Sequence, residues 1–256
     1  MLKGKSIVVI GGTSGIGKSA RNAFINHGAS VVYTGLSPEE TNIKNAIYSP
    51  GDAKEEGSAE KAINLCIREF GSFDGLYHVA GGSGRAWGDG PLHELSVSAW
   101  NETLNLNLTS VMLSNRAAVR EFRKSERAGS IVNLSTLLAN RPSPKYFSTH
   151  AYAAAKSAVI GFSRSIASYY ASEDIRVNVI SPGLIRTPMA ERAAGRSDIQ
   201  TFISTKQPLD GGRMGHAEDL DMAAVYLLSD SSKFVTGQVL GVDGGWSVSE
   251  GQYPHE

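Results

Sequence analysis

Short runs of β-branched residues alternate with longer helical patterns along the chain, and this alternation restricts the possible folds more than any other feature of the sequence. Two strands joined by such a helix return on the same side, so they pair in parallel through right-handed crossovers and form a sheet covered on both faces. We therefore predict an α/β fold, with a doubly wound sheet of about seven parallel strands and helices on both faces. The predicted strands are SIVVI (6–10), SVVYT (30–34), AIYSP (46–50), DGLYHVAG (74–81), SIVNLS (130–135), IRVNVIS (175–181) and QVLGVDGG (238–245).

The size and charge of the chain limit the kind of partner it can have. With 256 residues, of which 41% are hydrophobic, the whole sequence 1–256 matches a single domain. Lys and Arg together number 25, as do Asp and Glu, and this balance argues against a basic nucleic-acid binder or a polybasic membrane binder. We expect a small-molecule partner, no nucleic acid and no membrane.

Signals for secretion or metal binding are weak. The single cysteine, Cys66, lies in an apolar helical pattern that is typical of a buried thiol. The N-terminus leads straight into the first predicted strand, without the apolar segment of a signal peptide. The histidines are scattered without ligand spacing. We therefore expect a cytoplasmic location and no metal.

A glycine-rich turn lies directly between the first predicted strand and the first predicted helix. Glycines there permit a tight turn and let the backbone approach a pyrophosphate, whose charge meets the free amides of the helix. A glycine cluster alone could be an ordinary turn, but the strand, the glycines and the amphipathic helix together predict a nucleotide-binding site of the Rossmann type. The turn consists of Gly11, Gly12, Thr13, Ser14, Gly15, Ile16 and Gly17.

A tyrosine and a lysine stand four positions apart at the start of the helical segment 150–170, as Tyr152 and Lys156. Residues at this spacing lie on one face of a helix. A lysine cation beside a phenol favours the phenolate and brings the tyrosine pKa nearer to neutral, where the hydroxyl can exchange protons. Such pairs also occur on many solvated helix faces, so other motifs must decide between the two interpretations.

Those motifs point to one family. With three residues between Gly11 and Gly15, and three between Tyr152 and Lys156, the chain resembles the short-chain dehydrogenase/reductase family. The family's turn after the fourth strand keeps its small residues here but has lost both of its asparagines. The further matching segments are 78–81 (HVAG), Trp100 with Asn107, 181–187 (SPGLIRT) and 242–246 (VDGGW).

The resemblance implies four catalytic residues. In carbonyl reduction Thr136 would hold the developing alkoxide, and Tyr152 would give it a proton. Lys156 would lower the pKa of Tyr152 and bind the nicotinamide ribose. Asn107 would hold a water that links Lys156 to solvent, or it is a helix-bending residue bonded to backbone. Ser135 is the alternative to Thr136, since adjacent strand residues point to opposite faces and only one of them faces the substrate.

The resemblance also implies NAD or NADP as the cofactor. An acidic residue at the end of the second strand would bond the ribose of NAD and repel NADP, but Gly35 occupies that position. Leu36 stands where an arginine could attract the extra phosphate, whereas the hydroxyls of Thr34 and Ser37 could cradle it. The absent carboxylate favours NADP over NAD. The other predicted cofactor contacts are Asp52, with a turn-forming role as its alternative, and Ala53, Ala80, Gly81, Asn107, Tyr152, Lys156, Pro182, Gly183, Ile185 and Thr187.

Together these residues predict an NAD(P)-dependent oxidoreductase that interconverts a secondary alcohol and a ketone. The overall likeness to bacterial 3-oxoacyl thioester reductases indicates that substrate class, and the family implies a homotetramer or homodimer. Residues 187–215 have weak periodicity, a proline and a glycine pair, so we predict a substrate lid there, with a plain surface loop as the alternative. The alternative function is a non-catalytic dinucleotide-binding redox sensor or regulator, which would have no need of the tyrosine–lysine pair.

Overall fold

One parallel sheet organises the molecule. The computed structural model describes residues 1–37 and 43–251, and the rest of the predicted 1–256 domain, 38–42 and 252–256, lies outside the described residues. The seven strands follow the order β3-β2-β1-β4-β5-β6-β7, and every neighbouring pair is parallel. The predicted doubly wound α/β fold is confirmed. The strands are β1 (Ser6–Ile10), β2 (Ser30–Gly35), β3 (Ala46–Pro50), β4 (Gly75–His78), β5 (Gly129–Leu134), β6 (Ile175–Pro182) and β7 (Val239–Val242).

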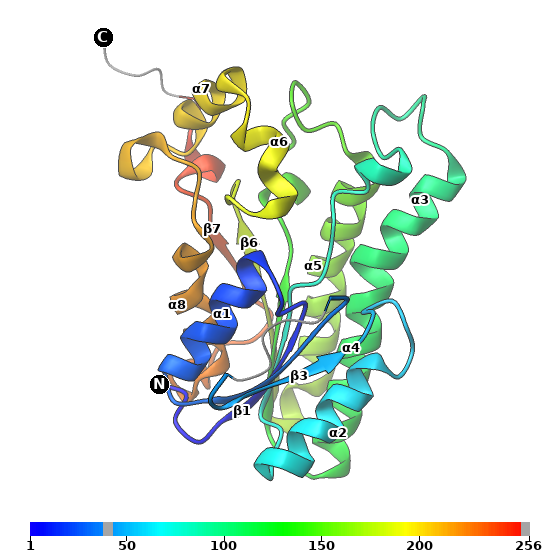
Figure 1. Cartoon of the computed structure of the whole chain (residues 1–256), viewed down its shortest axis with the longest axis vertical. Helices are drawn as coiled ribbons and strands as arrows, with labels where there is room; N and C mark the ends of the chain where they lie inside the picture. The colour runs from blue at the N-terminus through cyan, green and yellow to red at the C-terminus, as the bar shows by residue number, and fades with distance from the viewer. Residues whose placement is uncertain (38–42, 252–256) are drawn as a thin grey trace.

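Helices cover both faces of the sheet (Figure 1). On one face lie α1 (Gly15–Asn26) and α8 (Asp221–Leu228). On the other lie α2 (Ser58–Phe70), α4 (Ser110–Lys124) and α5 (His150–Tyr170). The helix α3 (Val97–Leu104) continues into α4 through a single π-helical turn, Asn105–Thr109. Short 3-10 helices span Arg85–Trp87, Leu137–Ala139, Ala171–Glu173, Pro188–Ala190, Leu209–Gly212, Ala217–Leu220, Asp230–Ser232 and Trp246–Val248.

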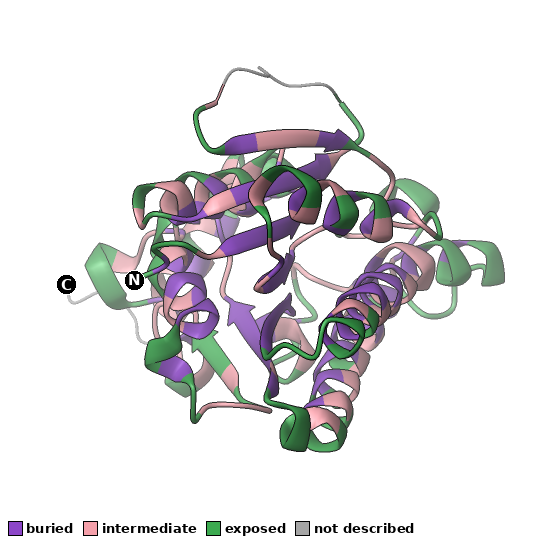
Figure 2. Cartoon of the chain, turned by 90° about the horizontal axis from the view of Figure 1, so that it is seen from below, coloured by how far each residue is buried: buried purple, intermediate pink, exposed green. Residues whose placement is uncertain are grey.

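The central strands are apolar on both sides because helices cover both sides. Every residue of β1 is buried, and its side chains alternate between the two cores: Val9 packs with Phe24 of α1, whereas Val8 packs with Phe122 of α4. A continuous apolar strand of this kind is typical of a parallel sheet. Burial of each phenylalanine contributes about 1.5–3 kcal/mol. Figure 2 shows this distribution, with buried residues along the strands and on the helix surfaces that face them.

The strand order places a crevice at the carboxyl ends of β1 and β4. These two strands are neighbours, with Ile10 opposite His78. From β1 the chain proceeds to β2 and β3 on one side, and from β4 it proceeds to β5, β6 and β7 on the other. The loops that follow β1 and β4 therefore diverge, and ligands of such sheets bind where they do so.

The segment predicted to be irregular, 187–215, contains more structure than its sequence indicated. It forms α6 (Glu191–Ala194) and α7 (Ser197–Lys206). Ile199 and Ile203, one helical turn apart, are buried with Trp246 in a small separate core. The partner of this apolar stripe comes from the far end of the chain, which is why a local pattern did not show it. Among the described helices, none is both long enough and apolar enough to cross a membrane.

Candidate active site

The glycine-rich turn leads directly into α1, and within the described residues no side chain caps the amides at the start of that helix. Gly11 and Gly15 have φ angles of 88° and 48°, a backbone region that favours glycine. A Cβ atom at Gly17 would overlap the carbonyl oxygen of Gly11. Ser14 precedes the helix without capping it, and in the described structure the first turn of α1 has no acidic residue. The amides of this turn therefore suit a phosphate group.

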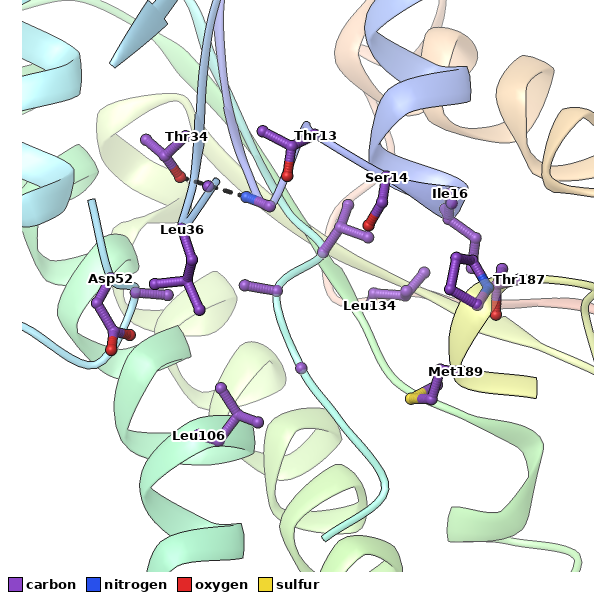
Figure 3. A pocket seen from close by; sticks show the side chains of 18 of the residues that line it. Thr13, Ser14, Ile16, Thr34, Leu36, Asp52, Leu106, Leu134, Thr187 and Met189 are labelled. Carbon is purple, nitrogen blue, oxygen red and sulfur yellow. Dashed lines mark hydrogen bonds between the residues drawn. The ribbon is translucent and has the colours of Figure 1, made fainter. Parts of the chain in front are cut away.

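This turn forms one wall of a cavity of about 430 Å3, which we call the first cavity (Figure 3). Its other walls come from the loops after β2, β3 and β4 and from α5. Leu36 and Asp52 lie at one end, and Thr187 and Met189 lie at the other (Figure 3). The predicted cofactor contacts that line it are Gly11, Thr13, Ser14, Gly15, Ile16, Gly35, Leu36, Ser37, Asp52, Ala53, Ala80, Gly81, Tyr152, Lys156 and Thr187.

The remaining predicted contacts lie elsewhere. Pro182, Gly183 and Ile185 line a smaller, second cavity of about 170 Å3, together with Thr136. Gly17 and Asn107 line neither cavity and act through packing and hydrogen bonds instead. Thr34, whose hydroxyl was expected to help hold the extra phosphate, also lines the first cavity. Several further residues of this cavity were not predicted to bind cofactor: Gly51, Val79, Leu106, Leu134, Pro188 and Met189.

The end of β2 is tied to the glycine turn by two hydrogen bonds to Thr34, one to its side chain and one to its backbone. The Gly11 amide donates to Thr34 Oγ1 at 3.3 Å, as the dashed line in Figure 3 shows, and the Gly12 amide donates to the Thr34 carbonyl at 2.8 Å. Leu36 follows with 76% of its surface exposed. Asp52 lines the cavity, and its Oδ1 accepts from the Lys54 amide at 2.9 Å, as the turn-forming alternative requires.

Helix α5 and the end of β5 bring three of the predicted catalytic side chains together. The Thr136 side chain lies close enough to Tyr152 to affect its pKa, and both line the second cavity. Ser135 also lines this cavity, but its Oγ donates to the Lys156 carbonyl at 2.8 Å. The structure therefore places Thr136 rather than Ser135 against Tyr152. Tyr152 lines the first cavity as well as the second, and so it stands between them.

Burial sets the electrostatics of the tyrosine and the lysine. It raises the pKa of Tyr152 to about 12, although the Thr136 side chain opposes this, and it lowers the pKa of Lys156 to about 8. The sequence predicted that Lys156 would lower the pKa of Tyr152. In this structure the ammonium lies 6.0 Å from the centre of the phenol ring and donates to the Leu134 carbonyl at 2.9 Å, so loss of hydration dominates.

Asn107 lies in the π-helical turn between α3 and α4, and backbone groups occupy both ends of its amide. Its Nδ2 donates to the carbonyls of Gly82 and Thr103 at 2.8 and 2.9 Å, and its Oδ1 accepts from the Gly82 amide at 3.0 Å. These bonds agree with the alternative given for Asn107 above, a helix-bending residue bonded to backbone. Asn107 also lies close to Lys156, because both side chains lie beside Gly81. A Cβ atom built on Gly81 would lie 2.8 Å from Asn107 Oδ1 and 3.2 Å from Lys156 Nζ.

Comparison with known proteins places the whole site in one family. A family model described as enoyl-(acyl carrier protein) reductase matches residues 11–247. The solved structure of a short-chain type dehydrogenase/reductase from Mycobacterium ulcerans superposes with a TM-score of 0.87 at 32% identity, over 98% of this chain and 92% of that one. The chain belongs to the short-chain dehydrogenase/reductase family. It is therefore an oxidoreductase of CH–OH or keto groups.

Relatives within the short-chain dehydrogenase/reductase family carry names for several substrates. A cis-4-hydroxycyclohexanecarboxylate dehydrogenase from Sinomonas cyclohexanicum is 33% identical over 94% of this chain and 96% of its own length. A 3-oxoacyl-(acyl-carrier-protein) reductase from Chlamydia muridarum is 33% identical over 96% of this chain and 98% of its own. The solved structure of an aldohexose dehydrogenase from Thermoplasma acidophilum has a TM-score of 0.86 at 26% identity, over 100% and 98% of the two chains.

His78 stands where this short-chain dehydrogenase/reductase has lost a family asparagine. The side chain is buried, and its Nδ1 lies 2.7 Å from Ser114 Oγ of α4. Burial, aided by the charge of Lys156, lowers the pKa of His78 to about 3, so the ring is neutral at physiological pH. The histidine thus joins β4 to α4 by hydrogen bonding.

Sequence reasoning missed the residue that fixes the start of the catalytic helix. The Oδ1 of Asp89 accepts from the Ala151 amide at 3.0 Å, and its Oδ2 accepts from the Tyr152 amide at 2.9 Å. Thr149, the residue before the helix, makes no such bond. An acid at a helix N-terminus satisfies free amides and complements the helix dipole. Asp89 lies far upstream in sequence, so no local signal identified it.

Proposed function

We propose that this short-chain dehydrogenase/reductase interconverts a secondary alcohol and a ketone, with Tyr152 as the general acid and base. The observation that carries the proposal is the position of Tyr152, which lines both cavities and shares the second one with Thr136. A carbonyl oxygen held in the second cavity by these two hydroxyls would present its carbon toward the first cavity. Hydride transfer requires this adjacency.

The residues of the first cavity fit a nicotinamide dinucleotide. The amides of the glycine turn would hold the pyrophosphate, Asp52 and Ala53 would contact the adenine end, and Lys156 would bind the nicotinamide ribose. Segment 181–187, with Pro182, Gly183, Ile185 and Thr187, would contact the nicotinamide end. When bound, the cofactor supplies or accepts the hydride. Because no carboxylate stands at Gly35, NADP is favoured over NAD.

The protonation states of the chain's own residues suit reduction. The raised pKa of Tyr152 keeps its hydroxyl protonated at neutral pH, so it can donate a proton to a developing alkoxide, and Thr136 holds the same oxygen. Oxidation of an alcohol needs the reverse transfer, for which the phenol must lose its proton. Lys156, with a pKa of about 8, is positioned to replace the proton. Asn107 would hold the water that connects Lys156 to solvent through the second lone pair of its Oδ1, since the Gly82 amide uses only one.

The relatives give two substrate classes for this proposed reaction. One is a 3-oxoacyl thioester, which the sequence also indicated, and the other is a hydroxylated ring. The segment 187–215 would act as a lid, because its residues Met189, Ala190 and Ala193 cover the second cavity. We place the enzyme in the cytoplasm.

We also propose a homotetramer, with a homodimer as the smaller assembly. One interface would use α4 and α5, where an outer groove is lined by Met112, Phe162 and Tyr170 among others. The other would use β7, which ends the sheet and leaves Leu240 exposed at its edge. Exposed apolar side chains on an edge strand favour pairing with a second copy.

Replacement of Tyr152 tests the function. In Tyr152→Phe we expect kcat to fall about 10²- to 10⁴-fold, because the proton donor is lost, while NADPH binding measured by fluorescence titration is retained. Turnover is followed by loss of NADPH absorbance with a panel of cyclic ketones, a 3-oxoacyl thioester and an enoyl thioester. Near-normal turnover of the variant would refute the role of Tyr152. Binding of NADPH by the wild type without turnover of any compound would favour the redox-sensor alternative.

A further inference from the structure

We propose that the substrate of this enzyme carries a carboxylate, and that Arg85 and Arg192 bind it at the second cavity. This inference rests on the proposed ketone–alcohol reaction and names its substrate class. Both arginines line the second cavity together with Tyr152 and Thr136. The reacting oxygen and the carboxylate would therefore occupy one cavity, each with its own partners.

The two guanidinium groups converge from distant parts of the chain. Arg85 begins the short helix after β4, and Arg192 lies in α6. Each donates to the same acceptor, the Tyr146 carbonyl oxygen, at 3.4 Å for Arg85 and 3.1 Å for Arg192. A guanidinium has five donors in a planar fork that matches a carboxylate. One shared carbonyl leaves most of these donors available to a ligand.

Within the part of the chain that the structure describes, no ion pair compensates the positive charge at this point, and Asp89 acts on Arg85 only at longer range. No carboxylate there lies within ion-pair distance of Arg85 or Arg192, whereas nearby Arg196 is paired with Asp198 at 2.6 Å. Burial and the like charge of Arg192 lower the pKa of Arg85, and only Asp89 opposes this. Two cations held together repel each other, and an anion bound between them would remove that cost.

The rest of the second cavity is small and mostly apolar, although Ser83, Ser135, Thr149 and Thr187 also line it. At about 170 Å3 it is close to the roughly 150 Å3 of a protein cavity that accepts benzene. A compact apolar body such as a six-membered ring fits this volume. The apolar side chains that line it include Leu138, Phe147, Leu184, Met189, Ala190 and Ala193.

These features together describe a compact keto acid or hydroxy acid. In its reduction the ketone carbon gains a hydride from the reduced nicotinamide, and the ketone oxygen gains the proton of Tyr152. The carboxylate takes no part in the bond changes. Its role is to orient the ring, because a charged hydrogen bond at one end fixes the position of the other.

A matched pair of substrates tests this inference. The probes are 4-oxocyclohexanecarboxylate and its methyl ester, which share the ring and the ketone but differ in charge. In the wild type with NADPH we expect kcat/KM to be at least about tenfold higher for the acid. In Arg192→Gln and in Arg85→Gln the acid-to-ester ratio of kcat/KM should fall about 10- to 100-fold, since a charged hydrogen bond is lost. Glutamine keeps an N–H donor for the Tyr146 carbonyl, so the loops remain bonded.

Arg196→Gln is the control variant, because Arg196 is paired with Asp198 and does not line the cavity. Its acid-to-ester ratio should equal that of the wild type. Equal turnover of acid and ester by the wild type and all variants would overturn the carboxylate inference and leave the proposed function intact.

A binding measurement separates the two proposals if neither probe is turned over. Each probe is then titrated calorimetrically into the protein with NADP⁺ present. Binding of the acid that exceeds binding of the ester and is lost in Arg192→Gln would support the carboxylate site while the proposed reaction fails. Equal binding of acid and ester would overturn the carboxylate site as well.

Discussion

The two cavities that meet at Tyr152 are lined by different kinds of chemical group. The first is lined by the glycine turn and by the ends of β2, β3 and β4, with backbone groups and few charged side chains. The second is lined by side chains from loops that are far apart in sequence, including Arg85 and Arg192. Backbone recognises what all dinucleotides share, whereas side chains recognise one substrate.

This difference explains why the family keeps one cofactor site and many substrates. A turn of glycines is specified by consecutive residues and by close packing, as at Gly17 against Gly11. The second cavity depends on how the segments around Arg85, Tyr146 and Arg192 fold over the sheet. Substitutions there can change specificity without disturbing the first cavity. The following variants test that division, from the largest expected effect to the smallest.

A single hydroxyl should matter most in the second cavity. In Thr136→Ala we expect kcat to fall about 10²- to 10³-fold, because a donor to the developing alkoxide is removed. Ser135→Ala is the matched control: it removes a buried hydrogen bond to the Lys156 carbonyl, which costs about 1 kcal/mol of stability, and kcat should stay within a few-fold. Steady-state kinetics measure kcat, and urea unfolding measures stability, in both variants. A larger loss of kcat in Ser135→Ala than in Thr136→Ala would make Ser135 the catalytic hydroxyl instead.

At the boundary between the cavities, burial of Lys156 should make stability depend on pH. Its pKa is about 8 when folded and 10.5 when unfolded, so between these values the unfolded state binds more protons and this contribution to stability rises with pH. Between pH 7 and pH 10.5 the wild type should gain about 3 kcal/mol relative to Lys156→Met. Other titrating groups are common to both proteins and cancel. A stability difference that is constant with pH, measured by urea unfolding, would show that the lysine is well hydrated.

In the first cavity, a single methyl group should disturb the backbone. A Cβ at Gly17 overlaps the Gly11 carbonyl, so Gly17→Ala should lower NADPH affinity about tenfold and cost about 1–3 kcal/mol of stability. Gly161→Ala provides the comparison, because a Cβ at Gly161 meets nothing within 4 Å, and its NADPH affinity should equal that of the wild type. Fluorescence titration measures both. Unchanged NADPH affinity in Gly17→Ala would mean that the glycine turn shifts to accommodate the added methyl group.

The smallest effect concerns the choice of cofactor. The wild type should use NADPH with a modestly higher kcat/KM than NADH. Leu36→Asp places a carboxylate at an exposed point of the first cavity and should lower the NADPH-to-NADH ratio about fivefold, whereas the uncharged Leu36→Asn should leave it nearly unchanged. Equal ratios in both variants, or a large preference of the wild type for NADH, would contradict the preference for NADP.

Features set by neighbouring residues could be predicted from the sequence. The strand pattern gave the seven parallel strands, and the glycine spacing and the pair Tyr152 and Lys156 gave the family. The family resemblance also implied Thr136 as the catalytic hydroxyl, with Ser135 as the alternative. In each case the physical cause, whether alternation, turn geometry or helical spacing, acts within a few residues.

Features set by tertiary packing could not be predicted in this way. The helix α7 lacks a strong pattern of its own and packs on Trp246, which is remote in sequence. The pKa of Tyr152 follows burial, which the spacing to Lys156 does not report. The convergence of Arg85 and Arg192 on Tyr146 depends on the paths of three loops.

Asp89 has a consequence for engineering this enzyme. It lies four residues after Arg85, in the same stretch between β4 and α3, and its carboxylate anchors the first turn of α5 beneath Tyr152. Transplanting that stretch from a relative to redirect substrate choice would also exchange the anchor of the proton donor. Chimeras that keep an aspartate at this position should retain turnover, and those that lose it should combine a new preference with a slower enzyme.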